Sequence, residues 1–372
     1  QGSGSLTTNS PWTADPMRCL RTPTLFLATA ALLATGCLSA VEAPLEPPPE
    51  GLTVSLQDSA VAGEMTWVSV ERPALDTGTI SYQSSDPAVL VVDSEGRVFP
   101  LKAGSVTITA RSPALAGTLT SAVRTRPDSF KVTYRFRWTP SSEERALFDR
   151  AAMRWQRVLR QASATITSFP GGGCLPGTVA ETIRQQGVTM WVDRFDEGSV
   201  APGVTGTAGP CVVDDLGRTR VGVMALRRSF SATAASLTSA EQLAWENQFV
   251  HQLGQAFGLS GLTTFGVPRP ELDQSTAGAP RWTGVQAMSA YRAAGGTGGG
   301  VPITADFNFW RTGDPGIAGD IMLPAVTATS RITGVSVGAL ADRGYGVDHR
   351  RAEPPPILLA PALTLRTIRH QP

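Results

Sequence analysis

Residues 51–125 alternate short strand-like segments with turn signals, and they contain no apolar period long enough for a helix. β-branched and aromatic residues dominate these segments, as they do in half-buried strands. Turns are indicated at Asp93–Gly96 and Lys102–Gly104. About seven short strands fit this length, which predicts a β-sandwich. The clearest segments are TWVSVE (66–71), ISYQSS (80–85), AVLVVD (88–93), RVFPL (97–101) and SVTITAR (105–111).

The second half of this region carries a specific pattern, SSDPAVLVVDSEGRVFPLKAGSVTITAR, at residues 84–111. It resembles the bacterial immunoglobulin-like family, group 2, and we assign residues 51–126 to such a domain. The resemblance implies a spacer or adhesive module on a cell surface, with no chemistry of its own.

The pattern changes in residues 128–350, where helices appear among the strands. Ser141 with Glu144 and Thr238 with Glu241 have the spacing of capping boxes, so each pair predicts a helix start. The second helix is expected to run to Gly258. The segment 130–138 alternates and predicts a strand, and the segments 187–195 and 219–228 are also expected to form strands. This order of elements predicts an α+β domain.

The second helix contains FVHQLGQAFGLSG (249–261), which has the frame of a zinc-protease HExxH motif with its working residues exchanged. In that motif two histidines, one helical turn apart, bind zinc, and the glutamate between them is the general base. Here only His251 and the later Gly258 occupy their places. Gln252 replaces the base, and an amide cannot accept the proton of a zinc-bound water. Gln255 replaces the second histidine, and an amide oxygen is a poor zinc ligand.

The segments 280–303, 305–311, 320–325 and 336–348 follow this helix in an order that resembles the leishmanolysin-like branch of the metzincins. The resemblance implies a zincin fold over residues 128–350 and a zinc endopeptidase family. It places Phe309 at the third zinc ligand, with Asp306 or Asn308 as shifted alternatives. It places Met322 in the Met-turn beneath the site. The expected fold class is thus multidomain, an all-β immunoglobulin-like sandwich followed by an α+β metzincin-like domain.

The N-terminal region has the features of an export signal. Arg18 and Arg21 follow Met17, and an apolar run from Leu25 to Ala34 precedes Thr35-Gly36-Cys37. The segment resembles a bacterial lipoprotein signal, although Ala34 stands where leucine is usual. The resemblance implies lipidation of Cys37, and simple secretion is the alternative.

The segments outside the two domains follow from this assignment. We interpret residues 1–16 as spurious or disordered upstream sequence and 17–37 as the signal. A Pro-rich tether covers 38–50, and 351–372 form a disordered tail. Leu38, directly after the lipid cysteine, favours the outer membrane.

Cys174 and Cys211 remain as an even pair after the signal is removed. In an exported chain such a pair can persist as a disulfide, and two free buried thiols are the alternative. Both positions also match paired cysteines of bacterial members of the resembled family.

We therefore expect an exported, lipid-anchored pseudo-peptidase that lacks zinc and any other cofactor and that binds an envelope or extracellular protein or peptide. The candidate peptide-binding edge strand is 219–228, with Val221, Gly222, Val223 and Met224. A net charge of +1 gives no reason to expect nucleic acid. Two alternatives remain open. One is an active zinc endopeptidase with an unusual ligand set, although Glu271 and Asp273 show no ligand spacing. The other is a purely structural or adhesive surface protein.

Overall fold

The computed structural model describes residues 51–354 except 161–164, 173, 175, 197–204, 234–235, 260–269, 276–278 and 306–308. The predictions for residues 1–50, including the signal, Cys37 and the tether, therefore lie outside the described residues. Among the described residues, no helix is both long enough and apolar enough to cross a bilayer.

Two antiparallel sheets form the first region, as the alternating segments predict. One sheet has the order β1-β2-β5-β4 and the other β3-β6-β7. In β6, Val106, Ile108 and Ala110 are buried while the residues between them face outward. All strands of these two sheets lie within 51–126: β1 (Thr53–Leu56), β2 (Thr66–Glu71), β3 (Ser81–Ser84), β4 (Leu90–Val92), β5 (Arg97–Pro100), β6 (Gly104–Arg111) and β7 (Ala116–Val123).

A mixed sheet organises the second region, with the strand order β12-β13-β11-β8. The strands β8 (Lys131–Phe136), β11 (Gly187–Phe195) and β13 (Thr219–Arg227) run parallel. The remaining strand, β12 (Gly206–Val213), lies antiparallel to β13 at the edge.

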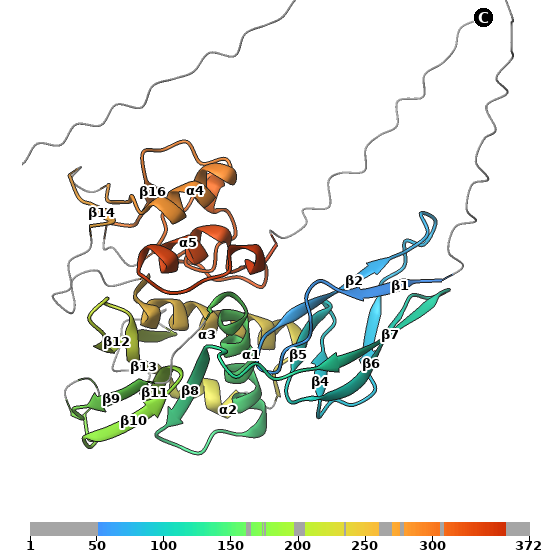
Figure 1. Cartoon of the computed structure of the whole chain (residues 1–372), viewed down its shortest axis with the longest axis horizontal. Coiled ribbons are helices and arrows are strands. Elements are labelled where there is room, and N and C mark those ends of the chain that lie inside the picture. The colour runs from blue at the N-terminus through green and yellow to red at the C-terminus, as the bar shows by residue number, and fades with distance from the viewer. Residues whose placement is uncertain are drawn as a thin grey trace, which may run out of the picture. The chain divides into compact units, whose positions relative to one another are not determined.

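Two long helices, α1 (Ser142–Val158) and α3 (Ser239–Gly254), pack side by side against this sheet (Figure 1). Phe148 and Phe249 stack with ring centroids 4.2 Å apart, and the Trp155 indole N–H donates to the carbonyl of Val250 at 2.7 Å. Both predicted capping boxes are present, so the helix starts at Ser141 and Thr238 are confirmed.

Smaller elements complete the region. The strands β9 and β10 form a separate two-stranded sheet that packs against the main sheet, while α4 and α5 pack together next to a short three-stranded sheet (Figure 1). Their bounds are β9 (Thr165–Phe169), β10 (Glu181–Gln185), α2 (Arg228–Thr233), η3 (Gln255–Leu259), β14 (Leu272–Asp273), β15 (Arg281–Trp282), α4 (Val285–Ala293), β16 (Val301–Pro302), η4 (Pro315–Ile317), α5 (Gly334–Asp342) and η5 (His349–Arg351).

Two sequence expectations are wrong. The segment 219–228 is not an edge strand, because β13 pairs with β11 on one side and with β12 on the other. The backbone of Val221, Gly222, Val223 and Met224 is therefore already paired within the sheet. The predicted tail also begins too early, because Arg351 lies in η5 and the buried Glu353 accepts hydrogen bonds from Arg154.

Candidate functional site

The candidate site lies at the C-terminal end of α3, where the helix changes its winding. α3 continues into the wider turn η3, and the backbone then reverses at Gly258, whose φ is 95°. This left-handed conformation strains any residue with a Cβ, so a glycine is required where the chain leaves the helix.

His251 is buried, and both of its ring nitrogens have partners. Nδ1 lies 2.7 Å from the carbonyl oxygen of Ile321, and Nε2 lies 3.1 Å from the side-chain nitrogen of Gln255. Since a carbonyl only accepts, Nδ1 carries the proton and donates, while Nε2 accepts from the Gln255 amide. Burial lowers the pKa of His251 to about 4, and the hydrogen bond to Ile321 only partly opposes this. The imidazole is therefore neutral at pH 7.

The ring of Phe309 stacks on the imidazole of His251. The two ring centroids are 5.2 Å apart and the planes are inclined by 26°. An apolar ring without a donor atom thus lies against the imidazole.

Met322 packs against α3 at Gly254. It is fully buried, and a Cβ on Gly254 of α3 would lie 2.4 Å from its sulfur. The turn is fixed by Asp320, whose carboxylate accepts from the Met322 N–H at 2.7 Å and from the Ser336 hydroxyl at 2.7 Å. The structure thus brings together His251, Phe309 and the Met322 turn, which are distant in sequence.

Gln252 faces the edge strand of the main sheet. Its amide nitrogen donates to the carbonyl of Gly206 in β12 at 3.3 Å. Its buried Oε1 atom has no hydrogen-bond partner among the residues that the structure describes. Gln252 therefore joins α3 to β12.

The residues present do not fit a zinc ion. A catalytic zinc needs three protein ligands with an open fourth position. His251 has both nitrogens engaged, Gln255 contributes an amide and Phe309 has no donor atom. Within the described ranges of 51–354, no group of three His, Cys, Asp or Glu side chains could hold a metal.

The other acidic candidates are used elsewhere or lie outside the described residues. Glu271 pairs with Arg343 at 3.4 Å, and Asp273 accepts from the Ser275 N–H at 2.8 Å. Asp306 and Asn308 belong to the segment that is not described.

The edge strand that sequence reasoning missed is β12. The Arg227 N–H donates to the Thr205 carbonyl at 3.2 Å. The odd-numbered residues at the start of β12 therefore form the hydrogen bonds to β13. Because hydrogen-bonding directions alternate along a strand, Gly206 and Ala208 direct their backbone groups outward. A bulge between Pro210 and Val212 interrupts the pairing. The sequence GTAGPCVV gives little strand signal, because glycine and proline are unfavourable in strands.

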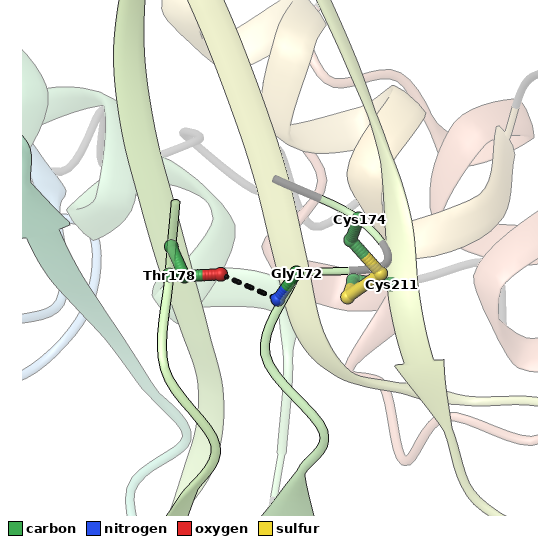
Figure 2. Close-up of a disulfide and its surroundings, with 4 residues drawn as sticks. All are labelled: Gly172, Cys174, Thr178 and Cys211. Carbon is green, nitrogen blue, oxygen red and sulfur yellow. Dashed lines mark hydrogen bonds between the residues drawn. A yellow bond between two sulfur atoms is a disulfide. The ribbon is translucent and has the colours of Figure 1, made fainter. Parts of the chain in front are cut away.

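A disulfide joins this edge strand to the segment between β9 and β10. Cys174 and Cys211 are bonded, with Cα atoms 5.6 Å apart, so the predicted disulfide is confirmed. Figure 2 shows the bond next to a turn in which Gly172 N–H donates to the Thr178 hydroxyl at 3.0 Å. The bond holds β12 at its bulge.

Comparison with known proteins identifies part of the chain. Residues 76–114, which span β3 to β6, match the family model described as the immunoglobulin-like domain of intimin. The sandwich is an immunoglobulin-like domain. Among curated proteins nothing matches the chain.

Several solved structures show low similarity. The intimin mutant of EHEC O157:H7 is 16% identical, covers 22% of this chain and 54% of its own, and has a TM-score of 0.18. The intimin–Tir90 complex gives 18% identity, 22% and 52% coverage, and a TM-score of 0.18. Domains 4 and 5 of the S-layer protein SbsC are 12% identical. The match covers 47% of this chain and 96% of that chain, with a TM-score of 0.19. The chain thus spans about half the length of the intimin chains that it matches. None of these findings supports the metzincin resemblance of residues 128–350.

Proposed function

We propose that the chain is a non-catalytic protein of the bacterial cell envelope whose immunoglobulin-like domain serves a structural or adhesive role. The observation that carries the proposal is the match of residues 76–114 to the immunoglobulin-like domain of intimin. His251 is neutral and covered by Phe309, and glutamines stand at 252 and 255, where an HExxH motif has its base and second ligand. These residues support a role without hydrolysis. The partner is an extracellular protein, and nothing in the charge balance favours nucleic acid.

Surface exposure and catalysis can be tested separately. Whole cells expressing the chain are treated with an impermeant amine label, and labelling of the chain at the surface is expected. Purified chain is then exposed to zinc, desalted and analysed by mass spectrometry, with less than about 0.1 zinc per chain expected. Recovery of the chain only from the cytoplasm would contradict the envelope role. One zinc per chain together with chelator-sensitive cleavage of casein would establish the active endopeptidase instead.

A second candidate function is binding of an extended polypeptide by the second region, as a leishmanolysin-like pseudo-peptidase. It is favoured by one observation: among the described residues β12 is an edge strand, and Ala208 directs its backbone groups away from β13, whereas the carbonyl of Gly206 already accepts from Gln252. An extended peptide can pair with such an edge through main-chain hydrogen bonds.

Binding at this edge is tested with an unstructured peptide library on the immobilised chain. Ala208→Pro removes one outward N–H group and is expected to reduce retention at least about tenfold, since a lost hydrogen bond and a blocked strand act together. Ala208→Ser keeps the N–H and serves as the matched control. Absence of any retained peptide, or equal retention by both variants, would refute this second function.

A further inference from the structure

A fully buried carboxylate on α3 is held by arginines from two different parts of the chain. Glu246 Oε1 lies 2.6 Å from Nη1 of Arg97, which belongs to β5 of the sandwich. Arg150 and Arg154 of α1 supply the other partners, at 2.8 and 3.4 Å. Burial alone would raise the pKa of Glu246, but the three guanidinium groups outweigh it and lower the pKa below its usual value.

A second buried carboxylate has the converse arrangement: it belongs to the sandwich, and arginines of the second region bind it. Glu64, between β1 and β2 of the sandwich, accepts from Arg126 at 2.8 Å, from Ser129 at 3.0 Å and from Arg351 at 2.6 Å. Arg160 approaches the same carboxylate at 3.5 Å. One carboxylate from each region is therefore neutralised by arginines that include those of the other region.

Apolar and backbone contacts lie between the two carboxylates. Met65 and Phe99 of the sandwich form one buried cluster with Met153 of α1. The Met65 N–H donates to the Met153 carbonyl at 3.2 Å, and the Gln156 amide donates to the carbonyl of Gly63. These contacts use the backbone of the sandwich, so they fix its position more closely than side-chain pairs alone.

We propose that the immunoglobulin-like sandwich is a fixed partner of the second region, docked on α1 and α3 through Glu246 and Glu64, and not a freely swinging spacer. Separation of the two regions would break ion pairs of Glu246 and Glu64 and leave these charges without partners. An unpaired buried charge is strongly unfavourable. Arg97 acts as the positioning residue, because it joins the sandwich to the buried carboxylate of α3. This inference is independent of what the protein binds.

The fixed geometry can be measured without altering the interface. Spin labels are introduced through non-natural residues at Gln83 of β3 and Gln286 of α4, both exposed, in the otherwise native chain. Pulsed EPR is expected to give a single distance distribution no broader than that of a label pair placed within the second region. A distribution as broad as that of two domains joined by a flexible linker would overturn the proposal.

The role of Arg97 is tested by a double-mutant cycle with Arg97→Met and Glu246→Gln, which keep side-chain size. The coupling between the two changes is expected to exceed tenfold in the unfolding equilibrium constant. The exposed pair Arg145–Asp149 on α1, with nitrogen and oxygen 3.0 Å apart, is the matched control, and at most a few-fold coupling is expected there. Equal coupling in the two cycles would contradict the proposal that Arg97 holds the sandwich to Glu246.

Discussion

His251 is a neutral core residue, and its burial and hydrogen bonds explain why. Burial disfavours the imidazolium form, and the Ile321 carbonyl holds the proton on Nδ1. Nε2, which would bind a metal, instead accepts from Gln255. The same surroundings that make His251 unsuitable for zinc make the stability of the folded protein sensitive to acid.

Stability is expected to fall as the pH decreases from about 6.5 toward 4. The pKa of His251 is about 4 in the folded protein, whereas that of an exposed histidine is about 6.5. The unfolded chain therefore binds the proton first, and the contribution of His251 is fully present only above pH 6.5. The loss reaches at most about 3 kcal/mol.

The pH effect is checked by urea unfolding at several pH values and by an NMR titration of the imidazole. His251→Gln should abolish this part of the pH dependence. A titration midpoint near 6.5 in the folded protein would contradict the buried, neutral assignment.

Gly254 allows the close approach of α3 to the Met322 turn. A Cβ at this position would lie 2.4 Å from the sulfur of Met322 and 3.0 Å from Cζ2 of Trp155. Gly254→Ala is therefore expected to lower the free energy of unfolding by about 1–3 kcal/mol, because overpacking forces both side chains to move. Denaturant unfolding measures the change. Gly209→Ala in β12, where a Cβ meets nothing within 4 Å, is the control and should change stability little.

Local signals predicted the helix starts, whereas pairing within the sheet could not be predicted from them. The capping boxes at Ser141 and Thr238 depend on contacts three residues apart, so the sequence reveals them. The position of β13 depends on which strands pair with it, and alternation does not encode that. Its nearly continuous apolar run, VGVMAL, is typical of a central strand and was the available signal.

The candidate site shows the same division between local and long-range information. The structure brings His251 together with Phe309 and the Met322 turn, which the sequence connected only through a family resemblance. The role of Glu246 was missed because its partner Arg97 is 149 residues away. An acidic residue on the apolar stripe of a helix indicates a buried partner but not its identity.

The disulfide is expected to stabilise β12 against the β9–β10 segment. Cys174 and Cys211 are 37 residues apart, and closing a loop of this length in the unfolded chain corresponds to about 3–4 kcal/mol. The double variant Cys174→Ser with Cys211→Ser should therefore lower the free energy of unfolding by about 3–4 kcal/mol. Thermal unfolding with and without reductant measures it, and the double variant should no longer respond to reductant. Equal stability of both proteins would show that the strand is held by other contacts.

At the scale of the whole molecule, the shared interface should make residues 51–354 unfold as one cooperative unit. Leu90 is fully buried in the sandwich core. Leu90→Ala removes its packing there and should destabilise the chain by about 2–5 kcal/mol. If unfolding is cooperative, the amides of Val250 and Leu253 in α3 should lose hydrogen-exchange protection to the same extent as those of Val106 and Ile108.

Hydrogen exchange followed by mass spectrometry or NMR distinguishes the alternatives for Leu90→Ala. Leu75→Ala, at a side chain that is 96% exposed, controls for the loss of a leucine without loss of packing and should leave all four amides unchanged. Loss of protection confined to the sandwich strands would mean that the two regions unfold independently. Equal loss in both regions would mean that a change in the immunoglobulin-like domain reaches the helices of the second region through the interface that they share.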